Sequence, residues 1–254
     1  MTPLNVLILC EQSGTEREAF ASRGHYAMSV DIAETTRPTH TYLNGGQSVH
    51  VVADALDYLP GGPQGDHEWD LVIAHPMCTY LTNSGVRWLF EVGDNDDLTE
   101  RAEKRWDELA KAIDFFNAIK TVNTRHLAIE NPIPHRHARQ GGHRQIEVGA
   151  ANVREFELPD GIGDPTQTVQ PWMFGHTESK ATSWWLKNLP DLTPTSNVKA
   201  EMLVLPKRET HKVHYASPGE GRWMARSTAF EGMAAAMADQ WGTYVVAQLE
   251  GVNL

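Results

Sequence analysis

One of the two cysteines, Cys78, stands in a short polar loop directly after an apolar run, where a thiol could carry out covalent chemistry. A thiol attacks only as the thiolate, so its surroundings must lower its pKa or supply a base. A lone cysteine is more often a buried structural thiol. The polar residues that follow nevertheless favour a substrate loop: Thr79, Thr82, Ser84. The other cysteine, Cys10, continues an apolar strand pattern, and we expect it to be buried in the core.

Polar or turn-forming residues follow each of five apolar runs in the first half of the chain. The runs predict strands at 6–9, 27–31, 49–54, 70–74 and 126–130. The residues at or just past their ends are Glu11, Asp31, Asp54, Pro76 and Glu130. Polar residues cap many strands, so one of them alone indicates little, but five in succession are harder to dismiss. Ligands bind outside the carboxyl ends of an open parallel sheet, so the pattern predicts a site along one edge.

Helical patterns alternate with these strands. A short helix is expected over 17–23, closed by Gly24, and a long one begins near Asp97 and carries an apolar face to Phe116. Strands alternating with helices predict an α/β fold with a mostly parallel, Rossmann-like central sheet. We expect three parts: an α/β core over 1–134, a small loop-rich lobe or insertion over 135–225, and a C-terminal helix over 226–254 that returns to the core.

The turn after the first strand and the acids after the next two suggest a nucleoside cofactor. Ser13 and Gly14 could present backbone N–H groups to a ligand, but no G-x-G-x-x-G is present, which disfavours a dinucleotide. An acid such as Asp31 can accept the hydroxyls of an adenosine ribose. S-adenosylmethionine fits these requirements. The residues expected to contact it are Glu11, Ser13, Gly14, Asp31, Ile32, Asp54, Ala55 and Pro76.

Composition limits the alternatives. The chain has 254 residues, 41% of them hydrophobic, and a formal net charge of −11, which argues against tight non-specific binding to a phosphate backbone. Two cysteines make no disulfide framework. No apolar stretch is long enough to span a membrane, and the first residues do not resemble a secretory signal, so the cytoplasm is expected.

The second half offers weaker signals. A local basic cluster around Arg136, Arg139 and Arg144 could contact phosphate, although a solvated loop explains it equally well. The pair Trp184 and Trp185 could stack on a base, whereas such pairs more often place one ring in the core. No metal site is expected, and no obligate protein partner is evident.

The cysteine loop and the end of the fifth strand resemble motifs of the DNA cytosine-C5 methyltransferases. The family's Pro-Pro-Cys loop corresponds to residues 76–85, which read Pro-Met-Cys-Thr-Tyr-Leu-Thr-Asn-Ser-Gly, and its Glu-Asn-Val motif corresponds to Glu130-Asn131-Pro132. Asp31 matches the family's ribose-binding acid and Asp54 the aspartate that reads the adenine amino group. The resemblance covers about residues 5–132. The first loop holds one glycine where the family has several, and the family's Gln-x-Arg-x-Arg strand is not evident.

The resemblance implies a methyltransferase fold and a covalent mechanism on cytosine. Cys78 would add to carbon 6, Glu130 would hold or protonate ring nitrogen 3, and Asn131 would position Glu130 or the loop. Thr79, Thr82, Ser84, Arg136 and Arg139 would bind the substrate. The stretch over 170–185 resembles compact methylase-like proteins from phages. Two alternatives stay open: the same chemistry on a free pyrimidine nucleotide such as dCMP, and a non-enzymatic binding module on the same fold.

Overall fold

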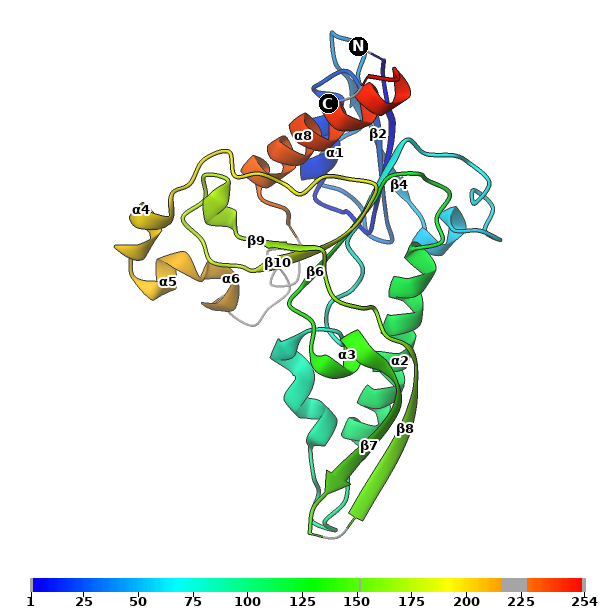
Figure 1. Ribbon diagram of the computed structural model, residues 1–254, viewed down its shortest axis with the longest axis vertical. Coiled ribbons are helices and arrows are strands. Elements are labelled where there is room, and N and C mark those ends of the chain that lie inside the picture. The colour runs from blue at the N-terminus through cyan, green and yellow to red at the C-terminus, as the bar shows by residue number, and fades with distance from the viewer. Residues whose placement is uncertain (1, 151, 216–227, 253–254) are drawn as a thin grey trace. The chain divides into compact units, whose positions relative to one another are not determined.

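A computed structural model describes residues 2–150, 152–215 and 228–252 (Figure 1). The chain forms two compact units, one made of residues 1–75, 122–130 and 166–254, the other of residues 76–121 and 131–165. These boundaries differ from the expected division at 134/135. The expected boundary at 225/226 lies outside the described residues.

The first unit is built on an eight-stranded sheet of order β3-β4-β2-β1-β5-β6-β10-β9. Its strands are β1 Asn5–Leu9, β2 Tyr26–Asp31, β3 His40–Thr41, β4 Gln47–Val52, β5 Leu71–Ala74, β6 Leu127–Pro132, β9 Gln167–Val169 and β10 Thr182–Lys187. Five of them, β4, β2, β1, β5 and β6, pair in parallel, whereas β3 and β9 pair antiparallel with their neighbours. The expected α/β class with a mostly parallel, Rossmann-like sheet is confirmed.

The first unit also contains seven described helices. They are α1 Thr15–Ala21, η1 Ala55–Tyr58, η3 Pro171–Met173, α4 Lys199–Leu203, α5 Lys207–Thr210, α6 Lys212–Tyr215 and α8 Glu231–Leu249. Helix α8 packs beside α1 (Figure 1), and Trp241 and Phe20 on these helices are fully buried in the core with Trp184 of β10. Trp185 is buried as well, so of the two possibilities for this tryptophan pair the structure supports a position in the core rather than stacking on a base.

The second unit places a helix against a hairpin. Its elements are η2 Asn83–Phe90, α2 Glu100–Ile119, α3 Arg136–Gln140, β7 Gly141–Val148 and β8 Asn152–Asp160. The rings of Trp106 on α2 and Phe156 on β8 stack with centroids 4.4 Å apart. This packing explains why residues 76–121 group with the hairpin and not with the α/β core, where the sequence pattern places them. A paired hairpin also replaces the loop expected after residue 135.

No helix among residues 2–150, 152–215 and 228–252 is both long and apolar enough to cross a membrane.

Candidate active site

A buried cluster of one histidine and three carboxylates lies at the carboxyl edge of the sheet in the first unit. His75 follows β5 directly, and its Nε2 lies 2.7 Å from Glu16 Oε2 of α1. Its Nδ1 lies 3.3 Å from Glu130 Oε2 of β6. The third carboxylate, Glu11, accepts the backbone N–H of Glu16 at 3.2 Å. Elements far apart in the sequence therefore converge on one imidazole.

The opposite charges of His75 and the carboxylates around it stabilise one another in their charged forms. Burial alone would lower the pKa of His75, but Glu16 and the Glu130 hydrogen bond raise it to about 10. Burial would raise the pKa of Glu130, yet the His75 hydrogen bond and the positive charge of Lys180 lower it. Burial and repulsion from Glu16 raise the pKa of Glu11 to about 7. At neutral pH the cluster thus holds an imidazolium between two carboxylates, with Glu11 near its midpoint of titration.

Two buried carboxylate oxygens of the cluster have no hydrogen-bond partner among the described residues: Glu130 Oε1 and Glu11 Oε2. A buried acceptor without a donor costs about 1–3 kcal/mol. For Glu130 the arrangement is directional, because Oε2 is bound by His75 while Oε1 is left to accept from something else. Such an oxygen is suited to a ligand that brings its own N–H group.

A second group of acids lies at the ends of β2 and β4. Asp31 accepts the Ala33 backbone N–H at 2.9 Å, and Asp54 caps η1 through the Leu56 N–H at 2.9 Å. Burial, then the charges of Asp31 and Asp54, raise the pKa of the Cys10 thiol to about 12. Cys10 follows the last residue of β1 and has a φ of 59°, so it is not part of the strand as expected, and it stays partly exposed rather than fully buried in the core. β1 ends at Leu9, and the chain turns there.

Exposed apolar side chains surround these acids. Ile32 is 79% exposed, Val52 is 48% exposed, and Leu56 is 49% exposed. Asp31 and Val52 are direct neighbours across the paired strands β2 and β4. Ala55, in contrast, is buried at the start of η1. Carboxylates beside exposed aliphatic groups suit a ligand with hydroxyl groups and a flat apolar ring.

The turn before α1 is held by its own side chains. Ser13 Oγ donates to Glu11 Oε1 at 3.1 Å and accepts the Thr15 backbone N–H at 3.2 Å. Gly14 has a φ of 72°, and a Cβ added there would lie 2.7 Å from Arg17 Nη2. Ser13 and Gly14 therefore shape the turn, and the first N–H groups of the helix are already bonded within the protein.

The loop that carries Cys78 belongs to the second unit. Cys78 is half-buried, and its carbonyl accepts the backbone N–H groups of Leu81 and Thr82. The loop is anchored by Asn131 Nδ2, which donates to the buried Pro76 carbonyl at 3.3 Å. Arg105 Nη2 donates to the Thr79 carbonyl at 2.8 Å. These contacts fix the backbone on both sides of the thiol.

The expected substrate residues of this unit differ in availability. Thr79 and Ser84 are exposed, whereas Thr82 is buried and hydrogen-bonded to Ser84. Arg136 is exposed, but Arg139 Nη1 is paired with Asp164 Oδ1 at 2.5 Å. This contact neutralises part of the expected basic cluster.

Sequence reasoning missed His75, Glu16 and Arg105. A histidine directly after a fully apolar strand was a usable signal, because its position alone puts it at the carboxyl edge. Glu16 and Arg105 had no such signal, since each looks like an ordinary charged residue on a helix.

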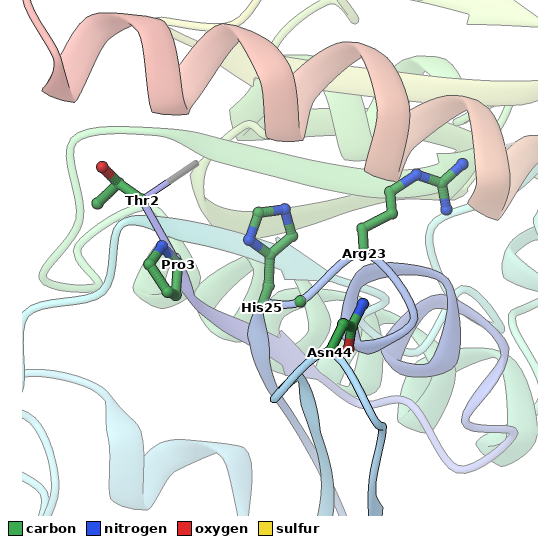
Figure 2. A pocket seen from close by; sticks show the side chains of 6 residues that line it. Thr2, Pro3, Arg23, His25 and Asn44 are labelled. Atoms are coloured by element: carbon green, nitrogen blue, oxygen red, sulfur yellow. The ribbon is translucent and has the colours of Figure 1, made fainter.

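A pocket lies at the other edge of the same sheet, where the strands begin. It is lined by Thr2, Pro3, Arg23, Gly24, His25 and Asn44, whose side chains Figure 2 shows. These residues precede β1, β2 and β4. The pocket therefore does not coincide with any predicted site residue.

No protein-family profile matches the sequence, and no curated protein matches it. Solved structures that resemble the chain include an E. coli prophage protein assigned as a DNA modification methyltransferase, with 15% identity, a TM-score of 0.38 and coverage of 72% of this chain and 46% of that one. Others are the 16S rRNA methylase RmtB, with 13% identity, a TM-score of 0.26 and coverage of 62% and 57%, and DhpI in complex with SAH, with 17% identity, a TM-score of 0.27 and coverage of 72% and 76%. The chain spans about half the length of the first two. These scores are too low to support any inference about function.

Proposed function

We propose that this protein is an S-adenosylmethionine-dependent methyltransferase that modifies carbon 5 of cytosine in DNA through a covalent bond to Cys78. The observation that carries the proposal is the Glu130 carboxylate, buried, held by His75 through one oxygen and unbonded at the other. Glu130 lies on β6, and the chain reaches Cys78 from β5, the parallel neighbour of β6. The chain therefore leaves β5 and β6 at the same edge of the sheet.

The residues at the ends of β2 and β4 fit the proposed cofactor. Asp31 would accept the ribose hydroxyls, and Asp54 would accept the adenine amino group. Exposed Ile32 would cover one side of the ring. Ser13 and Gly14 would shape the turn beside it, and Glu11 with its unbonded Oε2 would face the amino-acid part. When bound, S-adenosylmethionine supplies an electrophilic methyl group.

The protein's own residues would make cytosine reactive. Carbon 5 is a weak nucleophile until the Cys78 sulfur adds to carbon 6 and turns the ring into an enamine. The thiol proton passes to ring nitrogen 3 as the sulfur adds to carbon 6, and Glu130 Oε1 would accept the N–H so formed while His75 keeps the opposite oxygen fixed. Asn131 would hold the loop through the Pro76 carbonyl. After transfer, the carbon-5 proton is lost to solvent, and the nitrogen-3 proton returns to the sulfur as the C–S bond breaks.

A cytosine that carries fluorine at carbon 5 tests this sequence, because fluorine cannot leave as a proton. With S-adenosylmethionine present, we expect a covalent adduct on Cys78 by mass spectrometry. Cys78→Ser should form none while still binding S-adenosylhomocysteine, and Glu130→Gln should slow adduct formation without unfolding the protein. Cys10→Ser is the matched control and should react normally. Full turnover by Cys78→Ser, or an adduct mapped to Cys10, would contradict the mechanism.

A free nucleotide such as dCMP is the second candidate substrate. The net charge of −11 and the pairing of Arg139 with Asp164 favour it, because a nucleotide needs only one small phosphate site. Offering the fluorinated base both in an oligonucleotide and as the monophosphate separates the two.

A further inference from the structure

Helix α2 of the second unit has a strongly uneven distribution of charge. Its apolar stripe, which includes Trp106 and Ile113, is buried. At 3.6 residues per turn, one side of the stripe carries mainly basic residues and the other mainly acidic ones. The basic side carries Arg101, Lys104 and Arg105. The acidic side carries Glu100, Glu103, Asp107 and Asp114. Glu108 is the exception on the basic side, and it is paired with Lys111 at 2.9 Å.

The acidic side is used within the unit. Arg154 of β8 donates through Nε to Asp97 Oδ1 at 2.8 Å, and its Nη2 lies 3.4 Å from Glu103 Oε1. Asp96, in the turn before α2, accepts the Ala150 backbone N–H at 2.8 Å. These acids therefore hold the hairpin to the helix, and their charge is partly neutralised there.

The basic side meets aromatic rings. Arg101 and Arg87 both approach the Trp88 ring, with guanidinium carbons 4.2 and 4.4 Å from its centroid. Arg105 lies 5.0 Å from the centroid of the Tyr80 ring. A guanidinium over a ring keeps its N–H edge free for a bidentate contact with phosphate. We call these three arginines and two aromatic residues the arginine row: Arg87, Arg101, Arg105, Trp88 and Tyr80.

The arginine row places two positive charges on one indole, that of Trp88. Arg101 also forms a loose ion pair with Glu91, at 3.7 Å. Arg87 is exposed, and the Arg101 side chain is 62% exposed. Preformed, exposed guanidinium groups of this kind suit phosphates spaced along a chain.

We propose that the arginine row binds the phosphates of the DNA strand that carries the target cytosine. Arg105 connects the row to the nucleophile loop through the Thr79 carbonyl, one residue past Cys78. A strand held by Arg87 and Arg101 would therefore lead toward the reactive loop. The inference rests on the proposed function, and it narrows the class of substrate to a polynucleotide rather than a free nucleotide. It also replaces the expected contacts of Arg139, which is engaged with Asp164.

The test measures binding of a fluorescently labelled single-stranded oligodeoxynucleotide at several salt concentrations. For the double variant Arg87→Gln and Arg101→Gln, the slope of log K against log salt should fall by about 1.4, because each phosphate contact on a single strand contributes about 0.7. Affinity at 0.1 M salt should fall about 25-fold. The matched control is the double variant Arg125→Gln and Lys199→Gln, which removes two exposed positive charges from the first unit, one of them stacked on Trp172. It should bind like the wild type.

The experiment distinguishes a failure of the arginine-row proposal from a failure of the covalent mechanism. Equal binding by wild type and the arginine-row variant overturns the inference. A Cys78 adduct with the fluorinated monophosphate, together with no binding of the oligonucleotide, also overturns it while leaving the chemistry intact. Loss of oligonucleotide binding in the variant, with no adduct in any protein, supports the row and contradicts the covalent mechanism.

Discussion

Replacing His75 by glutamine should change how stability depends on pH. The folded state raises the pKa of His75 from 6.5 to about 10, which corresponds to about 5 kcal/mol in favour of the charged form. A raised pKa stabilises the protein fully below pH 6.5, and this contribution is lost as the pH rises toward 10. Between pH 6.5 and 9, the wild type should lose about 3 kcal/mol of unfolding free energy from this residue, at about 1.36 kcal/mol per pH unit.

His75→Gln removes the cation and leaves Glu16 and Glu130 buried without it. Breaking such a buried pair costs about 3–5 kcal/mol, so the variant should be less stable than the wild type by that amount at pH 7. Without the His75 cation, burial should raise the pKa of Glu130, so the variant should begin to lose stability from about pH 4.5 upward rather than from 6.5. Denaturant unfolding from pH 5 to pH 9 measures both curves.

The upper limit of pH 9 keeps the titration of Cys10 out of the comparison. The Cys10 thiol, with a pKa raised from 9.0 to about 12, affects stability only above that range. Glu11 titrates within it, with a pKa raised to about 7, so the difference between the two proteins is the quantity to read. His67→Gln is the matched control, because His67 is exposed and contacts no carboxylate in any described hydrogen bond or ion pair. The ion-paired cluster would be refuted if His75→Gln lost as much unfolding free energy between pH 6.5 and 9 as the wild type does, about 3 kcal/mol.

Two further predictions concern Asp31 at the end of β2 and the turn before α1. Asp31→Ala should weaken binding of S-adenosylhomocysteine by at least tenfold in calorimetry, about 1.4 kcal/mol for one lost charged hydrogen bond. Asp239→Ala, on the exposed side of α8, should leave the affinity unchanged, and equal affinities of the two variants would remove Asp31 from the site. Gly14→Ala should destabilise the protein by about 2 kcal/mol more than Gly45→Ala, measured by denaturant unfolding. Both glycines have positive φ, but only at Gly14 would the new Cβ meet a side chain, and equal losses would mean that Arg17 simply moves aside.

The parallel strands were the part of the fold that the sequence predicted well. Strands β1 and β5 are continuous apolar runs because both faces of a central parallel strand are covered, and such runs stand out between turn residues. The hairpin of β7 and β8 lacks this signal. More than half of β8 is exposed, and β7 mixes buried, partly buried and exposed positions, so neither strand shows the continuous apolar run that predicts a central strand.

The sequence predicted where the candidate-site residues lie on the sheet, but not which side chains they contact. The edge rule places Glu130 and the start of the cysteine loop together with the acids of β2 and β4. It cannot show that His75 joins Glu16 and Glu130, because those contacts bridge 59 and 55 residues of chain. Pairing at such separations depends on how α1 packs on the sheet, and no local pattern encodes it.

The electrostatics of the edge also bear on Cys10, which the sequence alone could not show. Burial first, then the charges of Asp31 and Asp54, raise the pKa of the Cys10 thiol to about 12. If these acids hold adenosine as proposed, the same charges that bind the cofactor help to keep the nearby sulfur protonated and unable to attack the methyl group, since only a thiolate is nucleophilic. Cys78 lies in the other unit, on a loop anchored by Asn131 and Arg105. The proposed mechanism therefore predicts an adduct on Cys78 and none on Cys10.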